Sequence, residues 1–248
     1  MKQILAIKGV RNNSLTIITL LLIAILVFSI QTTANPAGIA VVENSTDAML
    51  VAPPDDRTDP GGTITTMVMD VLQQNPRWKA YVGNISGSLT LDDSDGRSIF
   101  QWQMGAEDLT GNLFISRSDA VAWNDIECSN QSVINQEEAF LLFDSSSVDS
   151  INRTFSSTIH NEILIGFNTI PQNTCRSTST FVDDEAQTQS SADFQIALLA
   201  SGTDVVYTSP ITSGTTSYRG DGDVDFQIIV PDQDSIDTTT YFFYAEIR

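Results

Sequence analysis

The chain has few of the side chains on which most catalytic and metal centres depend. Its 248 residues include one histidine, two cysteines and 12 basic residues, against 31 acidic ones. A nucleophilic triad needs a base beside its nucleophile, usually histidine, and a zinc site needs three or four nitrogen or sulfur ligands at set spacing. His160 is the one candidate base, and we interpret it as a residue of the surface or of a sheet edge. The composition therefore argues against an acyl-transfer enzyme and against a zinc protein.

Basic residues are scarce enough to exclude further classes of partner. Three of the 12 lie in residues 1–34, which contain no acid, so the rest of the chain has nine basic and 31 acidic residues and a net charge of about −22. A field of that sign repels nucleic acid and anionic membrane surfaces. A solvated acidic surface, a salt-rich habitat and bound Ca²⁺ each account for the acidity, and these explanations stay open.

One long apolar run is present, from Leu15 to Ile30. Basic residues precede it and Thr32-Thr33-Ala34 follow it, which is the order found in a signal peptide with its cleavage site. The run is shorter than the roughly 20 apolar residues of a spanning helix. We predict that residues 1–34 are a cleaved signal peptide, with a retained membrane anchor as the alternative. In both cases the rest of the chain is exported to the cell surface and meets the membrane only through this segment.

After the export segment, the chain divides into a linker and one domain. Residues 35–62 are rich in proline and aspartate, which break regular elements and keep a spacer solvated. Within them, Ile39–Val42 is interpreted as a peripheral strand of its own domain, with pairing to a neighbouring subunit as the alternative. Residues 63–248 alternate β-branched and aromatic residues between turn-forming clusters, which predicts a single all-β domain, a β-sandwich of the jelly-roll kind.

Particular strands can be placed within this domain. Ser88–Met104 predicts a hairpin, because Asp95-Gly96 is a dipeptide that type I′ turns prefer. A second hairpin is predicted over Phe194–Thr208, and single strands over Val224–Val230 and Tyr241–Ile247.

One short helix, of two to three turns, is predicted near residue 132. Ser132 is the expected N-cap, and Glu137 and Glu138 are expected in the early turns, where carboxylates favour the positive end of the helix dipole.

Cysteine usage predicts one disulfide. Cys128 and Cys175 are the only cysteines, and an exported pair of this kind is oxidised. The segment Trp78–Gly87, with Phe100-Gln101-Trp102, the stretch Trp123–Cys128 and Cys175, resembles an uncharacterised family of secreted surface proteins of archaea and some bacteria. The resemblance covers roughly Trp78 to Cys175. It implies an exported surface protein with a paired disulfide, and it brings no known activity or ligand.

Clustered aspartates are the candidate metal ligands, because Ca²⁺ takes six to eight oxygen ligands. One cluster lies at the first hairpin turn and one before the strand at Val224: Asp92, Asp93 and Asp95, and Asp221, Asp223 and Asp225. Period-two spacing places the second trio on one strand face. Neither cluster matches an EF-hand loop, and the preference of aspartate for turns is the simpler explanation.

Four sequences match the N-glycosylation acceptor pattern, at Asn44, Asn84, Asn130 and Asn152. Occupancy there would make the chain a glycoprotein.

Three functional hypotheses follow. The leading one is a non-catalytic extracellular protein that acts by adhesion or assembly, as a cell-envelope or filament subunit, with another copy or a surface glycan or protein as partner. The second is a carbohydrate-binding module, in which Trp78, Trp102 or Trp123 would stack on sugar rings, although each is expected more often in a core. The third is a secreted glycoside hydrolase with two carboxylates. Its candidates are Glu107, Glu127, Glu137, Glu138 and Glu162.

Overall fold

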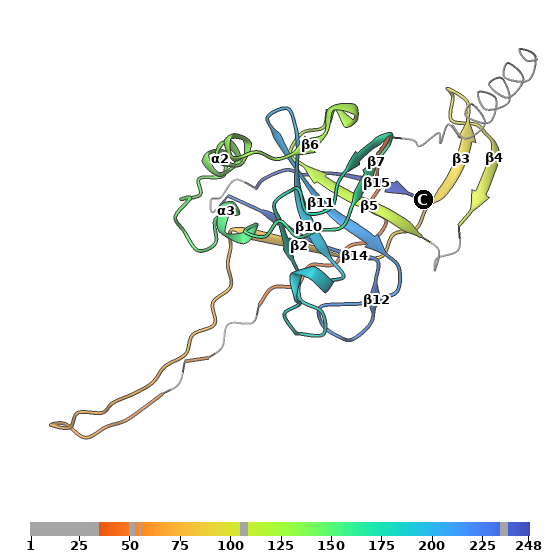
Figure 1. The fold of residues 1–248 in the computed structure, drawn as a ribbon. Helices are drawn as coiled ribbons and strands as arrows, with labels where there is room; N and C mark the ends of the chain where they lie inside the picture. Colours follow the sequence, from red (N-terminus) through yellow and green to blue (C-terminus); the bar gives the residue numbers. More distant parts are fainter. Residues whose placement is uncertain (1–34, 50–52, 55, 105–108, 234–237) are drawn as a thin grey trace, which may run out of the picture. The chain divides into compact units, whose positions relative to one another are not determined.

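The computed structural model describes residues 35–49, 53–54, 56–104, 109–233 and 238–248 (Figure 1). The expected signal or anchor segment, residues 1–34, lies outside the described residues, and so does Glu107. Within the described ranges, no helix is long and apolar enough to cross a membrane.

The all-β prediction is confirmed. Among the described residues, seven strands form one antiparallel sheet in the order β1-β15-β5-β11-β10-β6, with β9 also paired to β10. Their bounds are β1 Ala37–Gly38, β5 Thr110–Ser116, β6 Glu127–Cys128, β9 Ser177–Ser179, β10 Gln195–Ser201, β11 Asp204–Thr212 and β15 Phe242–Ile247. The C-terminal strand lies inside this sheet, between β1 and β5, as the sequence predicts (Figure 1).

Four two-stranded sheets complete the strands of the described chain. They are β2 Trp78–Gly83 with β14 Phe226–Pro231, β3 Ser88–Asp92 with β4 Ser98–Gln103, β7 Ile163–Ile165 with β8 Asn168–Ile170, and β12 Thr215–Thr216 with β13 Asp223–Val224.

The seven-stranded sheet is buried on both faces. Side chains alternate across a strand, so Leu113 and Ile115 of β5 enter one core, whereas Phe114 between them enters the other. On the first face, which we call the inner face, β2, β14 and two helices pack against the sheet, which gives a β-sandwich. On the second face, the β7–β8 hairpin packs against it. Burial on both faces explains why β10 is a continuous apolar run rather than an alternating one.

The predicted helix exists, but it begins earlier than expected. Helix α2, Gln131–Phe140, is ten residues long, and Asn130 is its N-cap, because the Asn130 Oδ1 accepts hydrogen bonds from the N–H groups of Ser132 and Val133. The assignment of the cap to Ser132 was wrong by two positions, and Glu137 and Glu138 consequently lie in the second half of the helix. Both are buried there, so packing rather than the helix dipole explains them.

Among the described residues, three further helices are short. They are α3 Ile151–Thr154 and the 3₁₀ turns η2 Trp123–Asp125 and η3 Gln189–Ser191.

The first predicted hairpin is confirmed as β3–β4, with a different turn. The Gly96 N–H donates to Asp93 O, and the Asp93 N–H donates to Arg97 O. Gly96 has φ +77°, whereas Asp95 is not among the residues with positive φ. A type I′ turn needs positive φ at both central residues, so the loop is instead a three-residue turn that ends in a left-handed glycine.

The remaining strand predictions are confirmed with small changes. β10 and β11 form the second hairpin around Gly202-Thr203. The predicted strand at Val224 is divided into β13 and β14. In the linker, the strand is Ala37–Gly38 rather than Ile39–Val42, and it pairs with β15 of its own chain.

Candidate functional site

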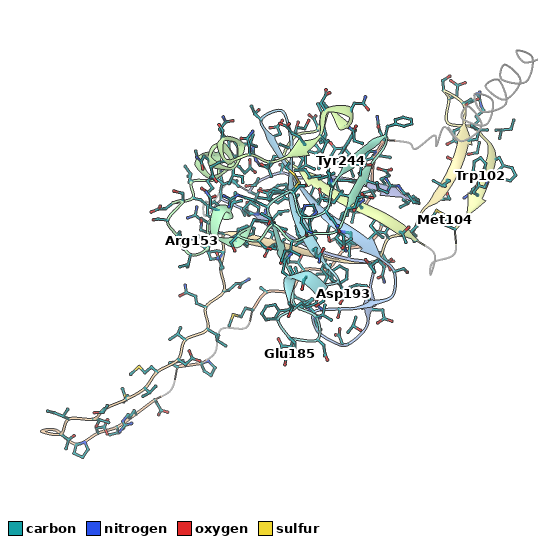
Figure 2. The ribbon with its side chains drawn as sticks, viewed as in Figure 1. Trp102, Met104, Arg153, Glu185, Asp193 and Tyr244 are labelled. Atoms are coloured by element: carbon teal, nitrogen blue, oxygen red, sulfur yellow. A yellow bond between two sulfur atoms is a disulfide. The ribbon has the colours of Figure 1, made fainter. Side chains whose placement is uncertain are left out.

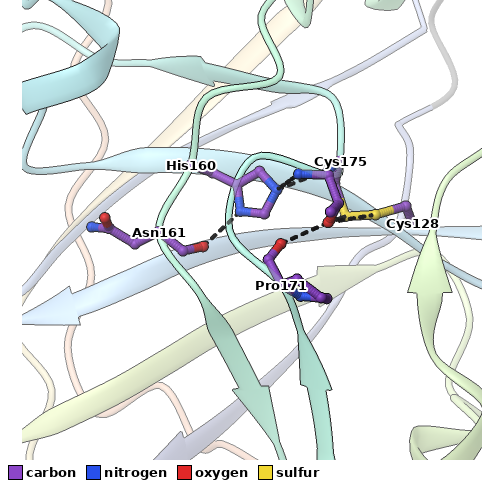
Figure 3. Close-up of a disulfide and its surroundings, with 6 residues drawn as sticks. Cys128, His160, Asn161, Pro171 and Cys175 are labelled. Carbon is purple, nitrogen blue, oxygen red and sulfur yellow. Dashed lines mark hydrogen bonds between the residues drawn. A yellow bond between two sulfur atoms is a disulfide. The ribbon is translucent and has the colours of Figure 1, made fainter.

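The disulfide between Cys128 and Cys175 is confirmed and ties β6 to the loop that precedes β9 (Figure 3). The two Cα atoms are 4.9 Å apart, and the closed loop spans 47 positions of sequence. Both residues contribute to the core on the second face of the large sheet, so the bond fixes a sheet edge rather than a mobile surface.

His160 lies beside this disulfide and is 2% exposed (Figure 3). Its Nε2 accepts hydrogen bonds from the N–H groups of Thr174, at 3.0 Å, and Cys175, at 2.8 Å, so its Nδ1 carries the proton and donates to Asn161 O. The interpretation of His160 as a surface or sheet-edge residue was wrong. Three backbone groups from two loops saturate the ring, which makes it a framework residue that holds the Cys175 loop.

Two hollows in the described part of the chain are candidate ligand sites. A cavity of about 20 Å³ lies beside His160, between Glu162, Gln195 and Thr208. It has room for about one water molecule, not for a sugar. A larger pocket of about 260 Å³ is lined by Arg117, Phe140, Gln233 and the three threonines 238–240.

The carboxylates predicted as candidates for hydrolysis either have separate partners or are exposed in the described structure. Glu137 is 2% exposed and receives bonds from the Arg117 guanidinium, with Nε 2.9 Å from Oε1. Burial alone would lower the pKa of Arg117, but Glu137 outweighs it and the pKa is raised. Burial and Glu137 also raise the pKa of Tyr207, whose hydroxyl faces Glu137 Oε1 at 3.4 Å.

The neighbouring Glu138 has a different role. Its two oxygens accept hydrogen bonds from the N–H and the side-chain amide of Asn152, at 2.8 and 3.1 Å. This joins α2 to α3. Glu127 and Glu162 are exposed at other positions.

The first aspartate cluster shapes the hairpin turn. Asp92 accepts from the hydroxyls of Thr90 and Ser98, and Asp93 accepts from the N–H groups of Asp95 and Arg97. Asp95 forms an ion pair with Arg97 at 2.7 Å. These bonds occupy the carboxylates in the way that aspartate commonly closes turns.

The second aspartate cluster is spread over separate partners. Asp225 is 8% exposed and accepts from the Ile85 N–H at 2.8 Å, while Asp221 accepts from the Ser217 hydroxyl. The prediction that the trio shares one strand face was wrong, because β13 ends at Val224 and the chain then joins a different sheet. In the described part of the chain, no group of three or more possible ligands gathers around a point. Calcium binding stays a prediction, which a higher melting temperature in millimolar Ca²⁺ would support.

The four glycosylation candidates differ in accessibility. Asn44 and Asn84 are exposed. Asn130 uses its Oδ1 as the α2 cap. Asn152 is bound through its side chain by both Glu138 and Gln131. A glycan attaches to the side-chain nitrogen, so at Asn152 it would replace the bond to Glu138, whereas the Asn130 cap uses the side-chain oxygen and would be kept.

The three tryptophans have different environments. Trp78 packs on the inner core and its Nε1 donates to Asp149 O. Trp123 packs edge-on against Phe114 and Tyr244 on the other face. Trp102 lies on β4 and is 49% exposed (Figure 2). Only Trp102 of the three presents a large open surface.

Trp102 belongs to an apolar face of the β3–β4 hairpin. Leu89 lies opposite Trp102 and Leu91 opposite Phe100, so the four side chains share one face, which we call the hairpin face. They are 43–56% exposed, and the Phe100 and Trp102 rings are 4.9 Å apart. In the described chain no third strand joins this hairpin. A lone two-stranded hairpin is marginally stable, and large exposed apolar patches are common at interaction sites, so the hairpin face is a candidate contact surface.

Comparison with known proteins gives no relatives. No family model matches the chain, and neither curated proteins nor solved structures give a match. The assignment to a family of secreted surface proteins therefore stays a prediction from the Trp78–Cys175 pattern.

Proposed function

We propose that this chain is a non-catalytic extracellular surface protein that acts by adhesion or assembly. The observation that carries the proposal is the hairpin face. Four large apolar side chains are held at a fixed register on a short hairpin, and they pack into neither core of the domain. Burying them would be favourable by about 25 cal/mol per Å² of apolar surface, so a partner is the natural reason for their exposure.

The rest of the chain fits an extracellular setting. Disulfides form and persist in oxidising compartments, and the N-terminal pattern is that of an exported chain. The high negative charge favours solubility of a secreted domain. Charge repulsion between copies is screened by salt, with a Debye length of about 3 Å at 1 M. Salt-dependent contact through apolar surface is therefore the expected mode of action.

The test uses the chain from residue 35 onward with its disulfide intact. Trp102→Lys places a charge on the hairpin face, and Gln101→Lys is the matched control, because Gln101 is exposed and pairs with Thr90 on the opposite face of the same hairpin. Sedimentation velocity measures self-association, and co-sedimentation measures binding to envelope fragments of the source cells. We expect Trp102→Lys to weaken one of these interactions and Gln101→Lys to preserve it. Equal behaviour of the two variants, or no interaction by the unaltered chain, would overturn the proposal.

A carbohydrate-binding module is the second candidate, favoured by the exposed Phe100 and Trp102 rings. Sugar rings stack on aromatic faces, and the two rings here stand edge to face at 65° rather than as a flat platform. Retardation of the protein in gels that contain polysaccharide, lost in Trp102→Ala, would select this candidate over protein assembly.

A further inference from the structure

The small sheet formed by β2 and β14 has one open edge. The Asp232 N–H donates to Arg77 O, and Val230 lies opposite Lys79. Since hydrogen-bonded pairs alternate in an antiparallel ladder, Lys79 and Tyr81 bond to β14, and the N–H and C=O groups of Ala80 point away from it. β14 is the only strand of the described chain that pairs with β2. We call this free side of β2 the acceptor edge.

The other edge of the small sheet is closed. The Ser209 hydroxyl donates to Gln227 O at 2.7 Å, and the Thr212 N–H donates to Asp225 O at 2.8 Å. Both donors belong to β11 of the large sheet. Hydrogen bonds therefore join the two layers of the sandwich along β14, whereas the edge formed by β2 has no neighbouring strand in the described chain.

The layer over the inner face also stops short of the edge of the large sheet. The inner-face side chains of β5 and β11, such as Leu113 and Tyr207, are fully buried. Those of β15, namely Phe243, Ala245 and Ile247, are only partly buried, although they belong to the same core. Tyr81 of β2 packs edge-on against Phe243, with centroids 4.9 Å apart. A strand added at the acceptor edge would thus lie over β15 beside Phe243, because the far end of β15 is already covered where Ile247 lies against Gly87.

The chain also contains a strand-like segment without a place in its own fold. Thr63–Leu72, which we call the donor segment, has neither helix nor strand, and all its residues are exposed (Figure 1). Ile64 and Val68 are 100% exposed. Its threonines and β-branched residues favour strands, and period two places Met67, Met69 and Val71 on one face.

Charge is not part of the match. Asp70 is the only charged residue of the donor segment. Lys79 on β2 is already paired with Asp232 at 2.7 Å, and the Arg77 guanidinium donates to the carbonyl groups of Leu141 and Leu142. The proposed contact therefore depends on backbone pairing and on burial of apolar side chains.

From these observations we propose that the donor segment of one copy adds as a strand to the acceptor edge of a second copy. The added strand extends the β2–β14 sheet, and Met67, Met69 and Val71 cover β15 beside Phe243. The proposal rests on the proposed assembly function and names its contact. It uses a different surface from the hairpin face, so the two can fail separately.

Sedimentation velocity from micromolar to millimolar protein, at high salt, tests the contact. Met69→Asp puts a charge on the face that would be buried, and Thr66→Asp puts the same charge on the opposite face. Burial of a methionine side chain predicts that Met69→Asp weakens association by about tenfold or more, while Thr66→Asp changes it little. The donor segment packs against no core, so neither variant endangers folding. Equal association of both variants would overturn the proposal even if Trp102→Lys still acts.

Cross-linking then tests the location. Val68→Cys and Ala80→Cys are made in separate chains and mixed under mild oxidation, so that a disulfide between positions 68 and 80 can form only between copies. We expect a mixed covalent dimer, mapped by mass spectrometry, and its loss when the Val68→Cys chain also carries Met69→Asp. Absence of the mixed dimer would overturn the proposal, and so would a double-cysteine chain that closes only on itself as a monomer.

Discussion

Replacing His160 by phenylalanine removes the ring nitrogens and keeps an aromatic side chain of similar size. The Cys175 N–H then loses its acceptor in a fully buried position. In partly buried positions, the Thr174 N–H loses its acceptor and the Asn161 carbonyl loses its donor. An unsatisfied buried group costs about 1–3 kcal/mol. We assign the full cost to the buried Cys175 N–H and half of it to each of the two partly buried groups. The free energy of unfolding is then expected to fall by about 3 kcal/mol.

Chemical denaturation at neutral pH, with the disulfide intact in all samples, measures this loss. Thermal unfolding of the same samples should show a melting temperature lower by about 6–12 °C for a domain of this size. His160→Gln should cost less, because an amide oxygen can accept from the same N–H groups. Ile159→Ala, at a neighbouring position that is 41% exposed, should stay within about 0.5 kcal/mol of the unaltered chain. A loss for His160→Phe no larger than for Ile159→Ala would refute the framework role of this ring.

Three other changes have defined outcomes. Replacing both cysteines by serine opens a loop of 47 positions and should lower the free energy of unfolding by about 4 kcal/mol in urea titrations; an unchanged midpoint would contradict this. Burial of Asp232 favours its protonated form, but Lys79 and Thr239 outweigh burial and lower the pKa of Asp232. The Lys79–Asp232 ion pair therefore stabilises the fold at neutral pH, and this stabilisation disappears as the pH falls through the lowered pKa. Lys79→Met should therefore cost up to about 1 kcal/mol near pH 7 and nothing at a pH below the lowered pKa of Asp232, and a cost independent of pH would count against it. Glu137→Leu leaves Arg117 unpaired and should cost about 3 kcal/mol, more than the double change with Arg117→Leu, as a thermal double-mutant cycle would show.

Much of the fold was predictable because its signals are local. Alternating apolar residues and turn dipeptides determine where a strand begins and ends, which is why the β3–β4 and β10–β11 hairpins and the C-terminal strand were found. The cap of α2 was missed by two positions, since Asn130 and Ser132 are both good caps and the choice depends on where the extended chain enters the helix.

The site depended on contacts that sequence spacing does not show. Asp225 meets Ile85 across 140 positions, and His160 meets Cys175 across 15. No local pattern distinguishes an aspartate that binds a distant N–H from one that is free to bind a cation, nor a buried histidine from an exposed one. Likewise, Trp78, Trp102 and Trp123 look alike in sequence, and only packing separates the two core residues from the exposed one.

Composition and periodicity by themselves determined the strand-rich class, the pairing of the only two cysteines and the acidic character of the protein, because these follow from residue types and their near neighbours. The tertiary structure alone decided which strand edges stay unpaired, which aspartates are already occupied and which apolar side chains remain outside both cores. Those properties depend on which distant segments come into contact. The free energy that favours these contacts comes from packing across the whole domain, so no single stretch of sequence encodes it.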